Sequence, residues 1–320
     1  MSTFSLPKPA GFRLSAARDY YANFTPGSGM AAADTRERLT LAFRLDATDA
    51  PVLVALSESE VAHSLSVEVV GNAEPRMVTR QLGRILGFEG DSEAWFALGE
   101  SDLVVGDLQR AFPGFLTAAK ASPYDAATWA VIAPRMNQAQ AARIKQALAR
   151  ELGDALSLDG TTHFVFPSPE VLRTLERFPG LSAEKVERLR GVADAACAGL
   201  LDAERLRDLG EQRALAELQQ LRGVGPWAAS HIYFRGAAPC DGLPLAEPRI
   251  LHGLASAYRL RSPSLATFQR IASGWRPFRT WVCVLLMRHL ASTAGWYAPG
   301  LAEERAHAGR ALMRRTSPVA

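Results

Sequence analysis

Apolar and polar residues alternate along the first part of the chain with the period of two that is typical of strands. The alternation runs through Leu39–Leu45 and again through His63–Val69, and the apolar run Pro51–Leu56 lies between them. Because successive side chains of a strand point to opposite faces of a sheet, this pattern predicts strands across residues 11–70. The expected structure is an antiparallel sheet.

Helical spacing then replaces the alternation. Val78, Leu82 and Ile85 lie three or four residues apart, which places them on one face of a helix. We therefore predict a helix that begins near Pro75, covers the sheet and ends at Gly87.

The rest of the chain has the spacing and the capping residues of helices. Tyr124–Leu152 is one amphipathic stretch that is interrupted near Pro134, and Asn137 is a good cap for its second half. Ser157–Pro167 is expected to be a loop. Further helices are expected after Ser168, after Ser182 and over Leu301–Arg315.

These patterns give the fold class and the domain division. The chain is predicted to be mostly α with a β-rich N-terminal domain, and so α+β overall. We assign residues 1–88 to the β-rich domain, in which we expect no functional site, and residues 89–320 to a helical body. A length of 320 residues is sufficient for two such units.

The helical body contains a turn that is suited to an anion. Residues 218–236 combine the end of a helix, a tight turn at Gly223-Val224-Gly225, and a second helix that opens at Pro226. Backbone N–H groups at such a helix start are unpaired and attract phosphate oxygens. The segment therefore predicts a hairpin that binds a nucleic-acid backbone. The alternative is two packed core helices that glycines merely connect.

Two further segments follow the hairpin in a recognisable order. They are DGLPLAE at residues 241–247 and GWRPFRTW at residues 274–281. Together with the hairpin, they resemble the helix-hairpin-helix (HhH-GPD) DNA glycosylase superfamily, and the pattern is closest to the 3-methyladenine DNA glycosylase II, or alkylation-repair, type. The resemblance covers about residues 122–296. It implies a body of two helical lobes with the active site in the cleft between them.

The resemblance implies that Glu247 is the catalytic carboxylate. Glycosylases flip the damaged base out of the duplex, and a carboxylate near C1′ stabilises the positive charge that develops on the sugar. The family uses an aspartate here, and glutamate reaches about one ångström further, a displacement that can cost ~100-fold in rate. Because Pro248 follows, we expect Glu247 to be a helix N-cap and to be ionised. The alternative is a surface charge in an inactive site.

The remaining site residues are also implied by the resemblance. Trp227 stands where bifunctional members carry a nucleophilic lysine, so no strand cleavage is expected. Trp227, Trp281 and Met287 are expected to line the base pocket, with Met287 in place of a stacking tryptophan.

The DNA contacts are expected to come from the hairpin and from a wedge. The hairpin residues are Arg222, Gly223, Val224, Gly225 and Trp227. Arg135 and Met136 stand where the family inserts a side chain into the base stack, although Ala133-Pro134 replaces its usual glycine–glutamine pair. Arg143, Arg276, Arg279 and Arg288 are candidates for extending the positive surface. The family also implies a Na⁺ or K⁺ ion at the hairpin carbonyls, but no cofactor and no metal bound by side chains.

Composition adds little to this picture. The chain has 48% hydrophobic and 22% charged residues and a formal net charge of +3, which permits DNA binding without requiring it. Cys197, Cys240 and Cys283 are scattered, which argues against a zinc site or an iron–sulfur cluster. The N-terminus lacks the apolar core of a signal peptide. We expect a cytoplasmic monomer that associates with the nucleoid when it acts on DNA.

Two functions of different class remain. The first is a monofunctional DNA glycosylase of base excision repair, which hydrolytically releases alkylated, 3-methyladenine-like purines from damaged duplex DNA. The second is a catalytically weak or inactive DNA-binding protein of the same fold. An unrelated helical enzyme with a chance glycine turn would not explain the three segments in this order.

Overall fold

The computed structural model describes residues 1–23, 31–32, 37–61 and 63–294. The strands predicted from alternation are present as β3 (Leu39–Arg44), β4 (Pro51–Glu58) and β5 (Ser64–Val70). With β1 (Ser2–Pro7) and β2 (Ala31–Ala32) they form an antiparallel sheet in the order β1-β5-β4-β3-β2. The expected helix Leu301–Arg315 lies outside the described residues.

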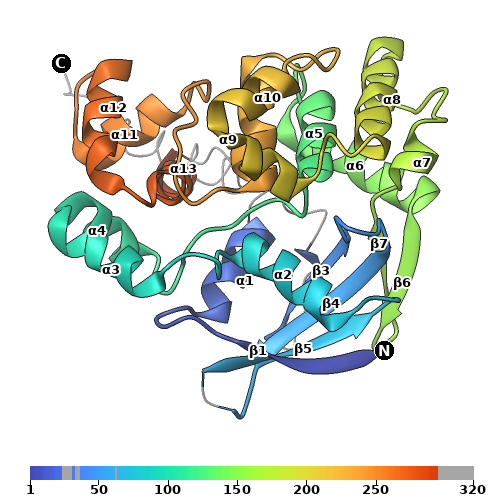
Figure 1. The fold of residues 1–320 in the computed structure, drawn as a ribbon, viewed down its shortest axis with the longest axis horizontal. Helices are drawn as coiled ribbons and strands as arrows, with labels where there is room; N and C mark the ends of the chain where they lie inside the picture. The colour runs from blue at the N-terminus through green and yellow to red at the C-terminus, as the bar shows by residue number, and fades with distance from the viewer. Residues whose placement is uncertain (24–30, 33–36, 62, 295–320) are drawn as a thin grey trace, which may run out of the picture.

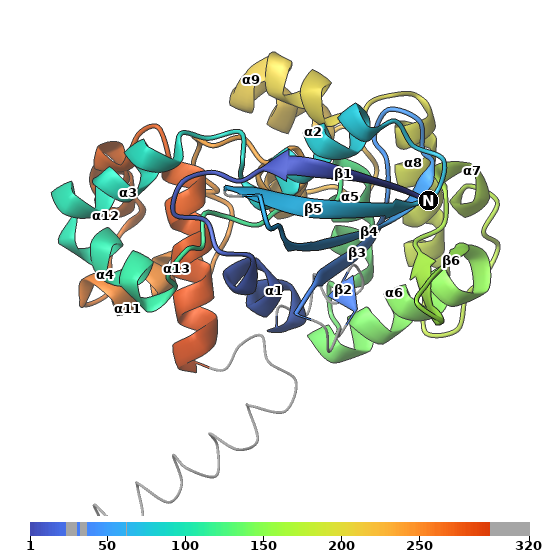
Figure 2. The same cartoon turned by 90° about the horizontal axis from the view of Figure 1, so that it is seen from below.

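A helix lies on each face of this sheet, as Figure 2 shows. The predicted helix α2 (Pro75–Leu86) covers one face and ends at Gly87, whose φ of 80° suits glycine. On the other face lies α1 (Leu14–Asn23), so the prediction of strands throughout residues 11–70 is wrong for this segment. Its buried residues Leu14, Ala17, Tyr20 and Tyr21 have helical spacing, which the sequence analysis overlooked.

A second β hairpin replaces the loop that was predicted for residues 157–167. It consists of β6 (Asp154–Leu158) and β7 (Thr161–Val165). The two residues between the strands, Asp159 and Gly160, both have positive φ, which is the geometry of a two-residue hairpin turn with Asp-Gly as its preferred sequence. Leu158 and Val165 are buried against side chains of β3 and β4, so the β6–β7 hairpin packs against the five-stranded sheet.

Three helices of the body begin at the predicted caps Asn137, Ser168 and Ser182, and another begins at Asp91. Asp91, Asn137, Ser168 and Ser182 each accept a hydrogen bond from a backbone N–H of the first helical turn, which satisfies donors that would otherwise be unpaired. The helices of the body are α3 (Ser92–Ser101), α4 (Leu103–Ala111), α5 (Pro123–Ile132), α6 (Gln138–Leu152), α7 (Pro169–Leu172), α8 (Ala183–Cys197), α9 (Ala203–Leu218), α10 (Pro226–His231), η1 (Ile232–Ala237), α11 (Ile250–Tyr258), α12 (Leu265–Ala272), η2 (Ser273–Trp275) and α13 (Arg279–Ala294).

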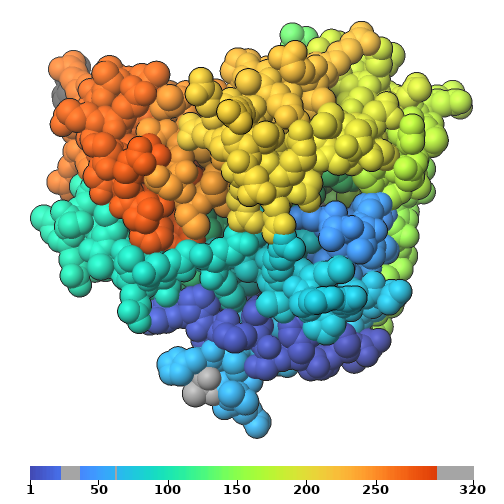
Figure 3. Space-filling model, viewed as in Figure 1, coloured from blue at the N-terminus to red at the C-terminus, as the bar shows by residue number. Residues whose placement is uncertain are grey.

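Most buried side chains belong to two large clusters. One joins the sheet, α1 and α2 to α3, α4 and the C-terminal helices α11–α13. The other lies within α5–α10 and η1. The C-terminal helices therefore return to pack beside α3 and α4, next to the separate lobe of α5–α10 (Figures 1 and 3). This arrangement confirms the predicted fold class. The domain division at residue 88 stays a prediction. Leu86 and Trp95, which lie on opposite sides of it, belong to the same buried cluster.

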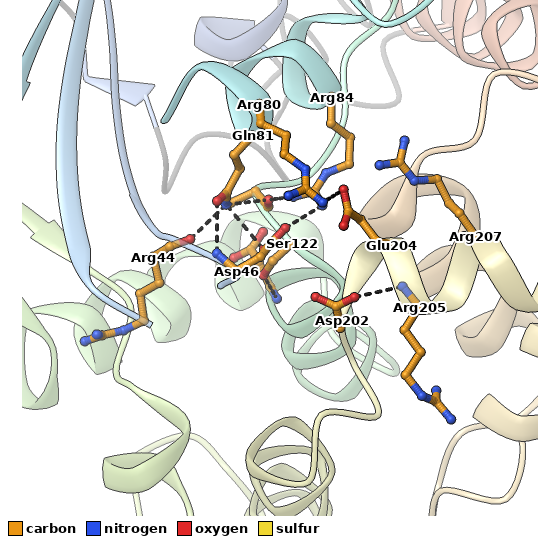
Figure 4. A network of polar contacts seen from close by, with 12 residues as sticks. Arg44, Asp46, Arg80, Gln81, Arg84, Ser122, Asp202, Glu204, Arg205 and Arg207 are labelled. Atoms are coloured by element: carbon orange, nitrogen blue, oxygen red, sulfur yellow. Dashed lines mark hydrogen bonds and ion pairs between the residues drawn. The ribbon is translucent and has the colours of Figure 1, made fainter. Parts of the chain in front are cut away.

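A polar seam joins the sheet domain to the lobe of α5–α10, the second lobe (Figure 4). Arg84 of α2 is almost fully buried and forms an ion pair of 2.5 Å with Asp46. Burial raises the pKa of Asp46, and the charge of Arg84 opposes this effect. Gln81 and Arg84 both donate to the carbonyl of Ala121, the residue before the N-cap of α5. The seam thus fixes the position at which the chain enters the second lobe.

No helix in the described part of the chain combines the length and the apolar composition needed to cross a membrane.

Candidate active site

The predicted hairpin is present between α9 and α10. Helix α9 ends at Leu218, and α10 begins with Gly225 as its N-cap and Pro226 as its first residue, as predicted. Val224 is buried in the second lobe and its N–H bonds the carbonyl of Leu221 at 2.9 Å. This anchor holds the turn against the lobe while the residues on either side of it stay at the surface.

The two glycines of the turn serve different purposes. Gly223 has a φ of 83°, which side chains disfavour. Gly225 has a φ of −85°, and a Cβ added there would meet open space. The turn therefore requires only the first glycine for its conformation, and the second leaves the surface in front of α10 clear. Arg222 is exposed and forms an ion pair with Glu187.

Helix α10 continues directly into a π-helix, η1. Such segments are rare and occur frequently at functional sites. This segment directs Phe234 and Arg235 toward the same pocket as α10. It was not predicted, because no simple residue pattern distinguishes a π turn from an α turn.

Residues from four parts of the chain line one pocket. They come from α1, from α10 and η1, from the loop before α11, and from α13. The lining residues are Tyr20, Trp227, Ser230, His231, Phe234, Arg235, Pro244, Glu247, Arg249, Ile250, Thr280, Cys283, Val284, Met287 and Arg288. Three residues that the sequence analysis assigned to the site, Trp227, Glu247 and Met287, are therefore brought together.

Glu247 is held in this pocket by several donors. One carboxylate oxygen accepts from the backbone N–H and the Nε of Arg249, at 3.2 and 2.6 Å. The other accepts from Nη2 of Arg249 at 2.8 Å and from Nε1 of Trp227 at 3.0 Å. The Glu247 side chain is only 14% exposed, so these contacts fix it away from bulk water.

The same contacts keep Glu247 ionised. Burial alone raises the pKa of a carboxyl group, but the hydrogen bonds and positive charge of Arg249, together with the indole N–H of Trp227, outweigh it. The pKa of Glu247 therefore lies below its usual value. The site thus holds a fixed negative charge beside an aromatic wall.

The expectation that Glu247 caps a helix is wrong. Helix α11 begins at Ile250, and Arg249 occupies its N-cap position. The N–H of Ile250 bonds the carbonyl of Glu247 at 3.1 Å, so Pro248 lies in a turn before the helix instead of in its first turn. The negative charge is stabilised by the side chain and backbone N–H of Arg249 and by the indole N–H of Trp227.

The loop that leads to Glu247 is tied to the start of α13. Asp241 accepts from the backbone N–H and the side chain of Arg279 and lies 3.1 Å from Arg276. Burial opposes ionisation of Asp241, but the bonds to Arg279 lower its pKa. Arg276 and Arg279 thus hold the loop in place through Asp241. Arg143, another candidate for the positive surface, is exposed on α6.

Trp281 does not line the pocket. It is 2% exposed and packs edge-on against Trp95, with Phe278 also in contact. The α13 residues in the pocket, from Thr280 to Arg288, follow helical spacing, and Trp281 lies outside that stripe. The base-pocket role predicted for it is therefore not supported by its position.

The predicted wedge residues lie in the turn between α5 and α6. Arg135 is exposed and has a φ of 60°, a conformation that is uncommon for residues with side chains. Met136 packs against the second lobe. Lys185 of α8 donates to the carbonyls of Ile132 and Pro134 at 2.6 and 2.8 Å, which fixes the shape of the turn.

Several residues of the pocket were not predicted to line it, and Arg288 was predicted only as a candidate for the positive surface. His231 stacks on Trp227, with ring centroids 5.3 Å apart, and Arg288 lies against the rings of Phe112 and Phe115. Tyr20 comes from the N-terminal domain, to which no site was assigned. The position of His231 four residues after Trp227, on the same helix face, was the one available signal.

A larger cavity, of about 210 Å³, lies between β3, α5, α6 and β7. None of the predicted site residues lines it. Two ion pairs lie in its wall, Lys145 with Asp125 and Arg44 with Asp154. We therefore assign the chemistry to the pocket around Glu247.

Among the residues that the structure describes, no group of His, Cys, Asp and Glu side chains is arranged to hold a metal ion. The Na⁺ or K⁺ ion at the hairpin carbonyls stays a prediction.

Comparisons with known proteins bear on both the sequence and the fold. No protein-family model matches the chain. The DNA-3-methyladenine glycosylase of Bacillus subtilis is 22% identical over 207 residues, which are 63% of this chain and 68% of that protein. A probable bifunctional transcriptional activator/DNA repair enzyme AlkA of Mycobacterium tuberculosis is 30% identical over 232 residues, which are 69% of this chain and 44% of that protein.

A solved structure matches nearly the whole fold. The 3-methyladenine DNA glycosylase from Archaeoglobus fulgidus has a TM-score of 0.72 at 20% identity, over 91% of this chain and 98% of that chain. This likeness extends through the N-terminal sheet domain as well as the helical body. The resemblance predicted from the three sequence segments is confirmed.

The environment of Glu247 predicts a pH dependence of stability. Because its pKa is lower in the folded than in the unfolded protein, the carboxylate contributes stability above the ordinary glutamate value of 4.5, and this contribution is lost as the pH falls through the folded-state value. Urea unfolding from pH 3 to 7 should show the wild type to be about 1–2 kcal/mol more stable than Glu247→Gln at pH 7, a difference that shrinks in acid. Glu151→Gln, an exposed control, should show no such change. A constant difference at Glu247 would contradict this assignment.

Proposed function

We propose that this chain, which shares its fold and its sequence motifs with the alkylation-repair type of helix-hairpin-helix DNA glycosylases, is a base excision repair enzyme that releases alkylated purines from DNA. The observation that carries the proposal is the fixed, ionised carboxylate of Glu247 in a pocket beside the hairpin. Fold alone would not assign a function, since function depends on the site. The names of the similar proteins point to the same activity.

The proposed reaction begins with DNA binding. The exposed N–H groups around Gly223 and Gly225 bind a phosphate of the damaged strand. Arg135 enters the base stack from its rigid turn, and the damaged base rotates into the pocket. In this scheme Met136, which packs against the lobe, supports the turn instead of entering the DNA.

Glu247 then acts on the sugar. As the N-glycosyl bond breaks, positive charge develops at C1′, and the carboxylate stabilises it in a site where few waters screen the interaction. Arg249 and Trp227 position the carboxylate. These contacts offset the extra length and flexibility of the glutamate side chain, because the guanidinium of Arg249 binds both carboxylate oxygens of Glu247. A water molecule adds to C1′ to complete the hydrolysis.

A second candidate is a DNA-binding protein of the same fold with weak activity or none. One observation favours it: Arg249 binds both oxygens of Glu247. A carboxylate that is paired in this way has less charge available for the sugar unless the pair loosens when DNA binds. This candidate retains the hairpin and the wedge but not the chemistry.

The proposed partner is duplex DNA that contains a damaged base, and the proposed working form is a monomer. A Na⁺ or K⁺ ion bound by the hairpin carbonyls would add positive charge beside the phosphate, which fits a backbone contact. Salt dependence of DNA binding would then reflect both the ion and the surface arginines.

Removal of the negative charge of Glu247 tests the proposed chemistry. Glu247→Gln should reduce base release from methylated duplex DNA by at least about 100-fold, because an amide does not stabilise the cationic sugar. Affinity for the same DNA should change less than about threefold. Glu247→Asp, which keeps the carboxylate, should retain measurable release. Equal release by wild type and Glu247→Gln would assign the chemistry to another group, and no release by wild type from a panel of lesions would favour the second candidate.

The hairpin contact is tested by Gly225→Val. The backbone of Gly225 accepts a side chain and the space in front of it is open, so the variant should fold with an unchanged melting temperature. Its side chain would stand where the phosphate approaches, and affinity should fall about tenfold for every DNA sequence alike. Gly274→Val, at another exposed glycine with open space, is the matched control. Unchanged affinity in a folded Gly225→Val protein would exclude the hairpin as the phosphate site.

Absence of strand cleavage is the third test. Trp227 offers no amine, and no lysine belongs to the described residues that line the pocket, so we expect no covalent imine with the sugar. Borohydride treatment during base release should therefore trap no protein–DNA adduct. A trapped adduct would show that an amine of this chain reaches C1′.

A further inference from the structure

One turn of helix α8 contacts both segments that are proposed to meet DNA. Lys185 donates to the carbonyls of Ile132 and Pro134, at the end of α5 and in the turn after it. Three positions further along α8, the side chain of Arg188 lies against the hairpin, where a Cβ added at Gly223 would be 2.6 Å from its Cδ. Positions three apart share one face of a helix. This face of α8 therefore lies against the turn after α5 and against the hairpin.

The turn after α5 holds the proposed wedge in an uncommon conformation. We call residues 133–136 the wedge turn. Arg135 has a φ of 60°, which residues with a side chain rarely adopt and which persists only where surrounding contacts maintain it. Within the turn, the N–H of Met136 bonds the carbonyl of Ala133 at 3.2 Å. Lys185 adds contacts from outside the turn, so it helps to maintain the conformation of Arg135.

An ammonium group suits this position. The last carbonyls of a helix have no partner within the helix, and a lysine side chain can donate three hydrogen bonds. Lys185 donates one to Ile132, the last residue of α5, at 2.6 Å and one to Pro134 at 2.8 Å. Hydrogen bonds from a charged donor are stronger than those between neutral groups. Lys185 therefore fixes the backbone on both sides of Ala133.

Helix α8 reaches the hairpin through two side chains. Glu187 forms an ion pair with Arg222, the residue before the turn, and Arg188 packs against Gly223. Leu189, in the same turn of α8, is fully buried in the second lobe, which fixes the helix between these contacts. The spacing between the wedge turn and the hairpin is therefore set by a rigid helical turn.

Positive charge gathers at this end of α8. Burial lowers the pKa of Lys185, and the charges of Arg135 and Arg188 lower it further, because like charges oppose protonation. Arg188 pairs with Glu184, but no described carboxylate forms an ion pair with Lys185 or Arg135. The phosphates of DNA would relieve this repulsion. The charge therefore fits a face that DNA covers.

We propose that Lys185 is a positioning residue for base flipping, an inference that rests on the glycosylase function proposed above. Lys185 holds the wedge turn in the shape that presents Arg135, and α8 keeps this wedge at a fixed distance from the phosphate bound at the hairpin. A strand bound at the hairpin then meets a wedge that is already in place, so less freedom is lost on insertion. Lys185 acts on flipping and not on the chemistry of Glu247.

Two substrates that differ only in the cost of flipping test this role. One methylated purine is placed opposite its pairing base in one duplex and opposite an abasic analogue in the other, where no base pair has to break. Single-turnover release is measured for both at saturating protein. Lys185→Met, which keeps the length of the side chain but donates no hydrogen bond, should lower the ratio of paired to unpaired release at least about fivefold. Lys185→Arg, which can donate to the same carbonyls, should restore most of the ratio.

A double substitution shows whether Lys185 acts through the wedge. Arg135→Ala should lower the same ratio, and Arg135→Ala combined with Lys185→Met should lower it no further, because residues that act through one another are not additive. Arg190→Met is the matched control, since Arg190 is an exposed cation of α8 that donates to the carbonyl of Arg173 at 3.1 Å. It should leave the ratio unchanged. Gly225→Val should lower both rates alike and also leave the ratio unchanged.

Fluorescence separates this inference from the proposed function. 2-Aminopurine beside the target nucleotide brightens when a wedge unstacks it, whether or not a base is released. Lys185→Met should give a rise about threefold smaller than the wild type at equal occupancy. If Lys185→Met does not fold, Lys185→Gln replaces it. An unchanged ratio in the folded variant overturns the inference and leaves the glycosylase function standing. If the wild type releases no base, the proposed function fails, and an unchanged fluorescence rise then overturns the inference as well.

Discussion

The ion pair between Glu247 and Arg249, with the indole N–H of Trp227 on the same carboxylate, is the contact on which the site depends. It joins the loop before α11 to the first turn of α10, and so joins the C-terminal helices to the hairpin lobe. A buried carboxylate without such donors would be protonated or would turn toward water. With them, the glutamate, which is longer than the aspartate that the family resemblance implies here, keeps one position and its charge.

This contact is possible because other parts of the fold place its partners accurately. Asp241 ties the start of the loop to Arg279 of α13. The seam of Arg84, Asp46 and Gln81 fixes the entry of the chain into the second lobe. The buried side chains of the two lobes form separate clusters, and the hydrogen bond from Trp227 to Glu247 crosses between them at the pocket.

Local sequence patterns correctly predicted the turns, helix starts and caps that depend on residues close together in the chain. The turn at Gly223, the helix start at Pro226 and the caps of α6 and α8 follow from residue types within a few positions of each other. Glu247 was found from its position in a segment that resembles the family. The helical spacing of α1 and the Asp-Gly turn of the β6–β7 hairpin were also visible, but strands and a loop were predicted there instead.

The composition of the pocket could not be predicted in this way. Tyr20, His231 and Arg288 are distant in the sequence and meet only when α1, α10 and α13 pack together. Trp281 was placed in the pocket from its motif, although the packing of α13 directs it toward Trp95. The role of Arg249 depends on where α11 begins. Pro248 suggested that this helix begins directly after Glu247, but Pro248 lies in a turn and α11 begins at Ile250.

The most direct test of the central claim is a crystal structure of the protein on duplex DNA that contains a cationic pyrrolidine analogue of the sugar in its transition state. The account predicts that a Glu247 oxygen lies within about 3.5 Å of the analogue's ring nitrogen, with Trp227 still donating to the carboxylate. A carboxylate that remains turned to Arg249 alone, with another group of the chain at the analogue, would contradict it.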